Sequence, residues 1–159
     1  MGTIAHNSRR SLLQDSSDES NFRIENTAEL REIDISQLIY VERDFHVVGN
    51  NILTAMNISS LVSVGGSLAV SNNTNLTALE LPNIQTVGTN FIVQDNADMS
   101  VLQAANLISV EGNLQISNTD VQLLSFVGLE YIQGDCVVQD NDMLLEIDFN
   151  NTESINGKH

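Results

Sequence analysis

Apolar residues recur along the chain with a period of about 23 residues, and this repeat is the dominant pattern of the sequence. Starting at Leu61, successive segments begin at Ile84, Leu107 and Leu129, at spacings of 23, 23 and 22 residues. Six apolar columns align across these segments: Leu61, Ile84, Leu107, Leu129; Val64, Val87, Val110, Ile132; Leu68, Phe91, Leu114, Cys136; Val70, Val93, Ile116, Val138; Leu76, Met99, Val121, Leu144; and Leu79, Leu102, Leu124, Ile147. Further steps back reach Phe22, so the repeat covers residues 22–150.

Each repeat predicts three short strands joined by turns. Alternation such as Leu68-x-Val70 is typical of a strand, Gly, Asn and Asp bound the short segments, and no segment has helical periodicity over ten residues. We therefore predict an all-β solenoid of about six coils, with parallel strands of successive coils stacked into three faces. Residues 1–21 are expected to form a polar N-terminal linker or tail, and residues 151–159 a polar C-terminal tail.

The ends of such a solenoid expose open strand edges, which promote association unless they are covered. Neither Ser11–Ser20 nor Thr152–His159 has the composition of a cap. The chain is therefore expected to be a fragment of a longer array or to bind partners at its ends. End-to-end association into a filament is the resulting hypothesis.

Charge restricts the class of partner. The formal net charge is −15, and no Lys or Arg occurs from Asp44 to Gly157. Nucleic acids and anionic membranes are therefore poor partners, because both require clustered cations. No apolar run approaches the roughly 18 residues of a membrane span, so direct membrane insertion is not expected. Cys136 is the single cysteine, which excludes an intrachain disulfide, and its place in a Leu/Phe column favours a buried, inert thiol.

One polar column could bear chemistry. Asn72, Asp95, Asn118 and Asp140 align, and because Asn and Asp tolerate left-handed backbone geometry, a structural turn ladder is the favoured interpretation. A calcium site is the weaker alternative, and its candidate ligands are Asp95, Asp98, Asp140 and Asp142. No other metal site and no cofactor is predicted.

The sequence contains no evident set of catalytic residues. The three histidines, His6, His46 and His159, are scattered, and no repeated nucleophile lies near any of them. The chain is therefore not expected to be an enzyme.

Two further patterns concern the surface. Four N-glycosylation acceptor motifs, which favour a secreted protein, begin at Asn57, Asn72, Asn75 and Asn150. Two outward rows are predicted, His46-Ala69-Ile92-Gln115-Val137 and Tyr40-Ser63-Thr86-Ser109-Tyr131. Neither row is a Thr ladder, which argues against ice binding. Tyr40, Tyr131, Ile92 and Val137 form a candidate protein-binding face, although ordinary surface scatter accounts for the same residues.

The motif L-x-x-V-G-G-x-L-x-V-x-N-N-x-x-L-x-x-L, from Leu61 to Leu79, resembles the receptor L-domain repeat and its relatives in fungal cell-wall glycoproteins of the sporulation-specific family. It is also leucine-rich-repeat-like. The resemblance covers residues 22–150 and implies a right-handed β-helix-like solenoid at a cell surface or in a wall, without catalytic residues. Receptor L domains usually carry disulfide caps, which a single cysteine cannot provide.

Three functions remain open from the sequence. The first is a non-catalytic extracellular or cell-surface interaction or adhesion module, whose signal peptide lies outside this chain. The second is a structural wall, sheath or filament component that assembles through the solenoid ends. The third is an intracellular scaffold of leucine-rich type.

Overall fold

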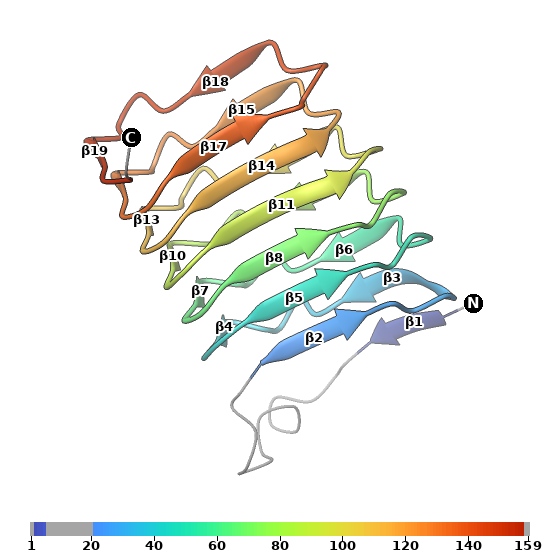
Figure 1. Ribbon diagram of the computed structural model, residues 1–159. Coiled ribbons are helices and arrows are strands. Elements are labelled where there is room, and N and C mark those ends of the chain that lie inside the picture. The colour runs from blue at the N-terminus through green and yellow to red at the C-terminus, as the bar shows by residue number, and fades with distance from the viewer. Residues whose placement is uncertain (1, 6–20, 158–159) are drawn as a thin grey trace.

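The computed structural model describes residues 2–5 and 21–157, and of residues 2–5 only the backbone path. These residues form parallel strands stacked coil upon coil, and no helix occurs among them (Figure 1). The predicted all-β solenoid of about six coils with three strands per coil is confirmed. Because the strands pair with residues one repeat away, as Phe45 does with Leu68, the period of the sequence is the period of the coil.

Face 1 of the solenoid carries the longest strands. Its six strands are β2 (Phe22–Glu25), β5 (Phe45–Val48), β8 (Leu68–Ser71), β11 (Phe91–Asn96), β14 (Leu114–Thr119) and β17 (Cys136–Gln139). Buried and outward residues alternate along these strands, as the two-residue periodicity requires. The predicted third and fourth apolar columns therefore point inward.

Face 2 consists of two-residue strands. They are β4 (Tyr40–Val41), β7 (Ser63–Val64), β10 (Thr86–Val87), β13 (Ser109–Val110), β16 (Tyr131–Ile132) and β19 (Ser154–Ile155), paired in that order. The second residue of each strand belongs to one apolar column, and in β4 through β16 it is buried.

Face 3 is divided into two sheets. One contains β1 (Gly2–Ala5), β3 (Leu30–Asp34) and β6 (Ala55–Asn57), and the other contains β9 (Ala78–Glu80), β12 (Val101–Gln103), β15 (Leu123–Ser125) and β18 (Glu146–Asp148). β6 and β9 are in contact but belong to different sheets.

Two strands extend the paired structure beyond residues 22–150. β1 pairs with β3 and β19 pairs with β16, so parts of both segments that were expected to be polar tails join the solenoid. Residues 1, 6–20, 158 and 159 lie outside the described residues, so most of the predicted N-terminal linker is not described.

The core contains a seventh apolar column that the sequence analysis missed. It lies two residues after the sixth column and comprises Ile35, Ile58, Leu81, Ala104, Phe126 and Phe149. All but Phe149 are buried. Phe126 packs edge-on against Phe91 and stacks on Phe149, which ties face 3 to face 1.

The polar turn after face 1 is a structural ladder, as the favoured interpretation predicts. Five residues of this column have left-handed backbones with φ from 53° to 56°: Asn26, Asn72, Asp95, Asn118 and Asp140. Gly49 holds the same place in its coil at φ 72°. Asn and Asp tolerate this region better than other residues with a Cβ, which explains their recurrence here.

The neighbouring column is buried and joins successive coils by side-chain hydrogen bonds. Asn73 is fully buried, its Nδ2 donates to the Val47 carbonyl at 2.8 Å, and its Oδ1 accepts from the Asn50 backbone N–H at 3.0 Å. Asn50 and Asn96 make the same donation to Ile24 and Val70. Among the described residues no buried side-chain N or O atom lacks a hydrogen-bond partner.

Candidate interaction sites

The C-terminal end of the solenoid is open. The last coil contributes β17 and β18, and among the described residues each of these strands pairs on one side only, with β14 and β15 respectively. β19 likewise pairs only with β16. Figure 1 shows these three strands at the end of the stack opposite β2. Strand edges of this kind present a row of backbone N–H and C=O groups to which another strand can bind.

Apolar side chains are exposed at this same end. Ile147, in the sixth column, is 45% exposed, whereas Leu124 one coil earlier is 0% exposed. Leu145 is 84% exposed and is the most exposed large apolar residue among the described ones. Seven such residues lie between residues 123 and 155: Leu123, Val127, Val137, Met143, Leu145, Ile147 and Ile155. We call the free edges of β17, β18 and β19, together with these side chains, the C-terminal end.

The N-terminal end differs. Three first-coil residues of the apolar columns are buried, with Ile24, Leu30 and Ile33 9%, 6% and 2% exposed, and Phe22 of the same coil is half-buried. β1 occupies the outer edge of β3. Large exposed apolar residues near this end, Ile39 and Tyr40, lie beside the free edge of face 2. Among the described strands, the N-terminal end therefore has free edges at β2 and β4 and an occupied edge at β3, whereas all three edges are free at the C-terminal end.

The electrostatic character of the C-terminal end is acidic. Asp135, Asp140, Asp142, Glu146 and Glu153 are exposed there, and no Lys or Arg occurs between Asp44 and Gly157 to offset them. Exposed apolar side chains interspersed with carboxylates suit a polypeptide partner and repel polyanions.

The residues of the two predicted outward rows align across the strands, but Ser109 is buried, and the candidate face is not a single patch. Tyr40 and Tyr131 lie on face 2 with three strands between them, which is roughly 19 Å at ~4.8 Å per strand. The Tyr131 hydroxyl donates to Glu111 Oε1 at 2.8 Å. Ile92 and Val137 lie on face 1, separated by β14. Only Val137 contributes to the C-terminal end.

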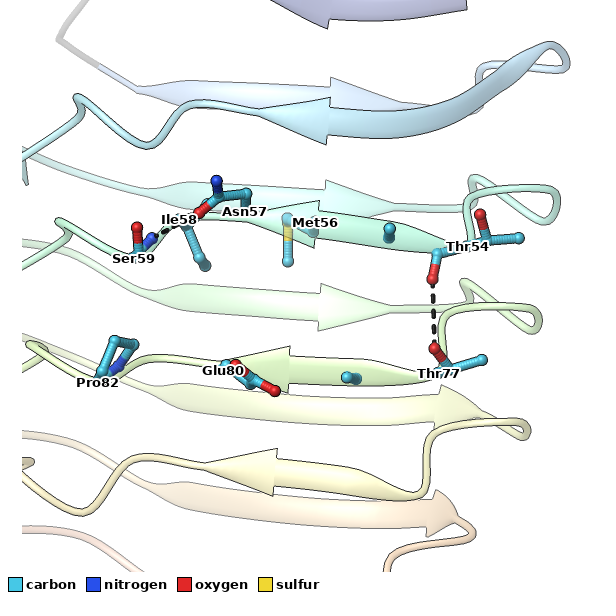
Figure 2. Close-up of a pocket in the computed structure, with 10 residues that line it drawn as sticks. Thr54, Met56, Asn57, Ile58, Ser59, Thr77, Glu80 and Pro82 are labelled. Atoms are coloured by element: carbon cyan, nitrogen blue, oxygen red, sulfur yellow. Dashed lines mark hydrogen bonds between the residues drawn. The ribbon is translucent and has the colours of Figure 1, made fainter.

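A shallow hollow lies where β6 and β9 fail to pair. Its volume is about 260 Å³, and Figure 2 shows Thr54 and Thr77 at one side, with Asn57 at the end of β6, Ser59 after it and Glu80 on β9. The Thr77 hydroxyl donates to the Thr54 carbonyl at 3.4 Å. The lining residues carry Ser and Thr hydroxyls and the Glu80 carboxylate, and they include no Lys, Arg, His or Cys.

The four glycosylation motifs are all accessible. Asn57, Asn72, Asn75 and Asn150 are exposed. The Asn57 Oδ1 accepts a hydrogen bond from the Ser59 backbone N–H at 3.4 Å, a local turn that holds the acceptor side chain at the margin of the hollow. A glycan on Asn57 would cover the hollow and leave the C-terminal end free.

The calcium candidates are dispersed. Asp95 Oδ1 accepts from Asn118 Nδ2 at 2.8 Å, and Asp140 lies two coils away from Asp95. Over residues 21–157 no three His, Cys, Asp or Glu side chains are placed to hold one metal ion. The structure therefore does not bring Asp95, Asp98, Asp140 and Asp142 together.

Cys136 and His46 are the remaining side chains that the sequence analysis considered for reactivity, and it favoured an inert thiol for Cys136. Cys136 lies at the free edge of β17 and is half-buried, and this burial raises the pKa of its thiol. His46 lies on face 1 with Nδ1 3.7 Å from Glu25 Oε1. His6 and His159 lie outside the described residues. No helix in the described part of the chain is long and apolar enough to cross a membrane.

Comparison of the chain with protein-family models, curated proteins and solved structures finds no match. The resemblance to receptor L domains and fungal wall glycoproteins stays an expectation based on the repeat motif. The geometry of the solenoid is therefore the basis for the functional proposal.

Proposed function

We propose that this chain is a non-catalytic protein-interaction module that acts outside the cell or at a cell surface and binds its partner through the C-terminal end. The observation that carries this proposal is the coincidence of three free strand edges with exposed apolar side chains at one end of the solenoid. Soluble monomers rarely leave such an edge uncovered, because it promotes association with other strands.

The binding mode that fits this end is strand addition. A partner strand paired to β17 or β18 supplies backbone hydrogen bonds, and its inward side chains cover Val138 and Ile147. The acidic margin disfavours nucleic acids and anionic lipids as partners. The faces along the solenoid offer only scattered apolar residues, so they rank below the end as binding surfaces.

The test uses charged substitutions that leave the core unchanged. Met143 and Leu145 are 49% and 84% exposed, so Met143→Lys with Leu145→Lys adds two charges at the end without removing core packing. The matched control is Gln85→Lys with Gln103→Lys, which adds the same charge at exposed positions of faces 2 and 3 in the middle of the solenoid. Circular dichroism and thermal unfolding establish that both variants are folded.

Each protein is immobilised and used to capture partners from native extracellular material, with bound protein quantified by mass spectrometry. The end variant is expected to lose at least about tenfold of specific binding, since each buried charge without a partner costs more than 1.4 kcal/mol. The control should bind like the wild type. Equal binding by both variants would place the binding surface on the side faces and overturn the proposal.

The extracellular assignment rests on the four exposed acceptor motifs and has its own test. Native protein analysed by glycopeptide mass spectrometry should carry glycans on at least one of Asn57, Asn72 and Asn75. Native protein with all of these side chains unmodified would favour the intracellular scaffold instead.

A further inference from the structure

The two ends of the solenoid differ by complementary steps. At the C-terminal end, face 2 extends one strand further than the other faces, because β19 follows β17 and β18. At the N-terminal end, the first coil contributes β2 and β3, and no face-2 strand precedes β4 in the described part of the chain. The strand that one end has in excess is thus the strand that the other end lacks.

The strand registers show how two copies would fit. Successive strands of face 1 align Phe22 with Phe45 and Leu114 with Cys136, so the next strand after β17 in this register is equivalent to β2. In face 2, Tyr131 aligns with Ser154 and Tyr40 with Ser63, so the strand after β19 is equivalent to β4. A single displacement of the second copy along the solenoid axis places its strands in register on both faces.

The same translation continues the apolar columns. Phe22 and Ile24 of the second copy would lie over Cys136 and Val138 of the first, and Ile33 would lie over Ile147. These three positions of the last coil are half-buried or exposed in the single chain. Gly157 of the first copy would then directly precede Asn21 of the second, as if one solenoid contained a break in its chain.

On face 3, docking of a second copy requires that β1 be displaced. The outer edge of β3, which β18 of another copy would need, is occupied by β1. The β1 pairing has an irregular register between Gly2 and Thr3, whereas β15 with β18 and β3 with β6 pair in continuous register. β1 therefore occupies the site of a preceding coil with a poorer match than a genuine coil strand provides.

We infer that the occupant of the C-terminal end is the N-terminal coil of a second copy, docked head to tail, with β18 of one copy replacing β1 at the edge of β3 of the next. This inference rests on the proposed function of the C-terminal end. Because the contact joins two different surfaces, it does not close on itself and leads to an open-ended assembly.

The charges at this junction oppose it. In the continued register Glu146 lies beside Glu32 and Asp148 beside Asp34. Like charges on directly adjacent strands are destabilising. Assembly is therefore weak at low ionic strength. It strengthens with added salt, because salt screens the repulsion between these exposed carboxylates.

Charge reversal at the Glu32–Glu146 contact tests both the partner and the register. Both side chains are exposed in the single chain, so Glu32→Lys and Glu146→Lys leave the core intact. Sedimentation velocity of the full chain over a concentration series gives the apparent dissociation constant. Each single variant turns a repulsion into an attraction and should associate about tenfold more tightly than the wild type. The double variant restores like charges and should return to the wild-type value.

A further variant tests the displacement of β1. Ile4→Pro removes a backbone donor from β1, so it weakens the pairing with β3 and should increase association. A chain that stays monomeric in all variants and at high salt would overturn the self-association. Tighter association with Glu146→Lys but not with Glu32→Lys would also overturn it, because the contact would then join two C-terminal ends. In either case, loss of another partner by the Met143 and Leu145 end variant would leave the proposed function standing.

Discussion

The adjacent residues Asn72 and Asn73 are chemically identical, but the structure predicts very different consequences for replacing them with Ala. Asn73 is fully buried, with Nδ2 bound to the Val47 carbonyl and Oδ1 bound to the Asn50 backbone N–H. Asn73→Ala leaves the buried Asn50 N–H without its partner and removes one bond from the Val47 carbonyl, which belongs to the paired strand β5. At about 1–3 kcal/mol for the unpaired N–H and about 0.5–1.5 kcal/mol for the lost bond, the expected loss is about 2–4 kcal/mol. The Asn50 Nδ2 keeps its bond to the Ile24 carbonyl and is not counted.

Asn72 provides the matched control. It is exposed and has φ 55°, so Asn72→Ala costs only the backbone strain of about 1 kcal/mol, and Asn72→Gly should cost less. Urea unfolding followed by circular dichroism measures the difference. With a slope of about 2 kcal/mol/M, Asn73→Ala should lower the midpoint by about 1–2 M and Asn72→Ala by about 0.5 M.

An acidic replacement separates the donor from the acceptor. Asn73→Asp keeps the acceptor for Asn50 but loses the donor to Val47, and it buries a carboxyl group whose pKa burial raises. The folded state then binds the proton more tightly than the unfolded state, so this variant should gain stability as the pH falls and lose it as the pH rises. Equal midpoints for Asn73→Ala and Asn72→Ala, or no pH dependence for Asn73→Asp, would refute the assigned ladder.

Three further predictions concern other parts of the solenoid. Cys136 has a thiol pKa raised by burial, so at neutral pH iodoacetamide should alkylate it more slowly in the folded chain than in urea; equal rates would contradict its placement. Millimolar calcium and excess EDTA should give the same thermal midpoint, because Asp95 bonds to Asn118 and no three ligands converge; a rise with calcium would reinstate the site. Gly88→Ala should cost about 1–3 kcal/mol because a Cβ there meets the Gly65 carbonyl, while the exposed Thr86→Ala should be nearly neutral by thermal unfolding.

Most of the fold was predictable because each coil repeats the same burial pattern. The six apolar columns identify the inward residues of all three faces, and the shorter 22-residue step from Leu107 to Leu129 leaves them intact. The seventh column was also visible, as the alternation Leu79-x-Leu81 that recurs in Leu102-x-Ala104 and Leu124-x-Phe126. It was missed because its side chains range in size from Ala to Phe. Its members share a position in the repeat but not a side-chain size.

The candidate site was predictable only in outline. The polar composition of the terminal segments indicated that the ends lack caps, but it did not distinguish one end from the other. Ile147 and Ile33 belong to the same column, but Ile147 is exposed and Ile33 is buried. This difference depends on which neighbouring strands cover each coil. The separation of Tyr40 from Tyr131 and of both from Ile92 likewise depends on how the faces are arranged.

By itself the sequence determined the repeat, the strand content, the inward columns and the absence of cations over most of the chain, because these follow from local periodicity and composition. Tertiary structure alone decided which of two adjacent asparagines is buried, where face 3 divides, and that β1 occupies the edge of β3 while β18 stays free. Those outcomes depend on contacts between coils about 23 residues apart and on the ends of the stack, where the repeat no longer supplies a neighbour for each strand.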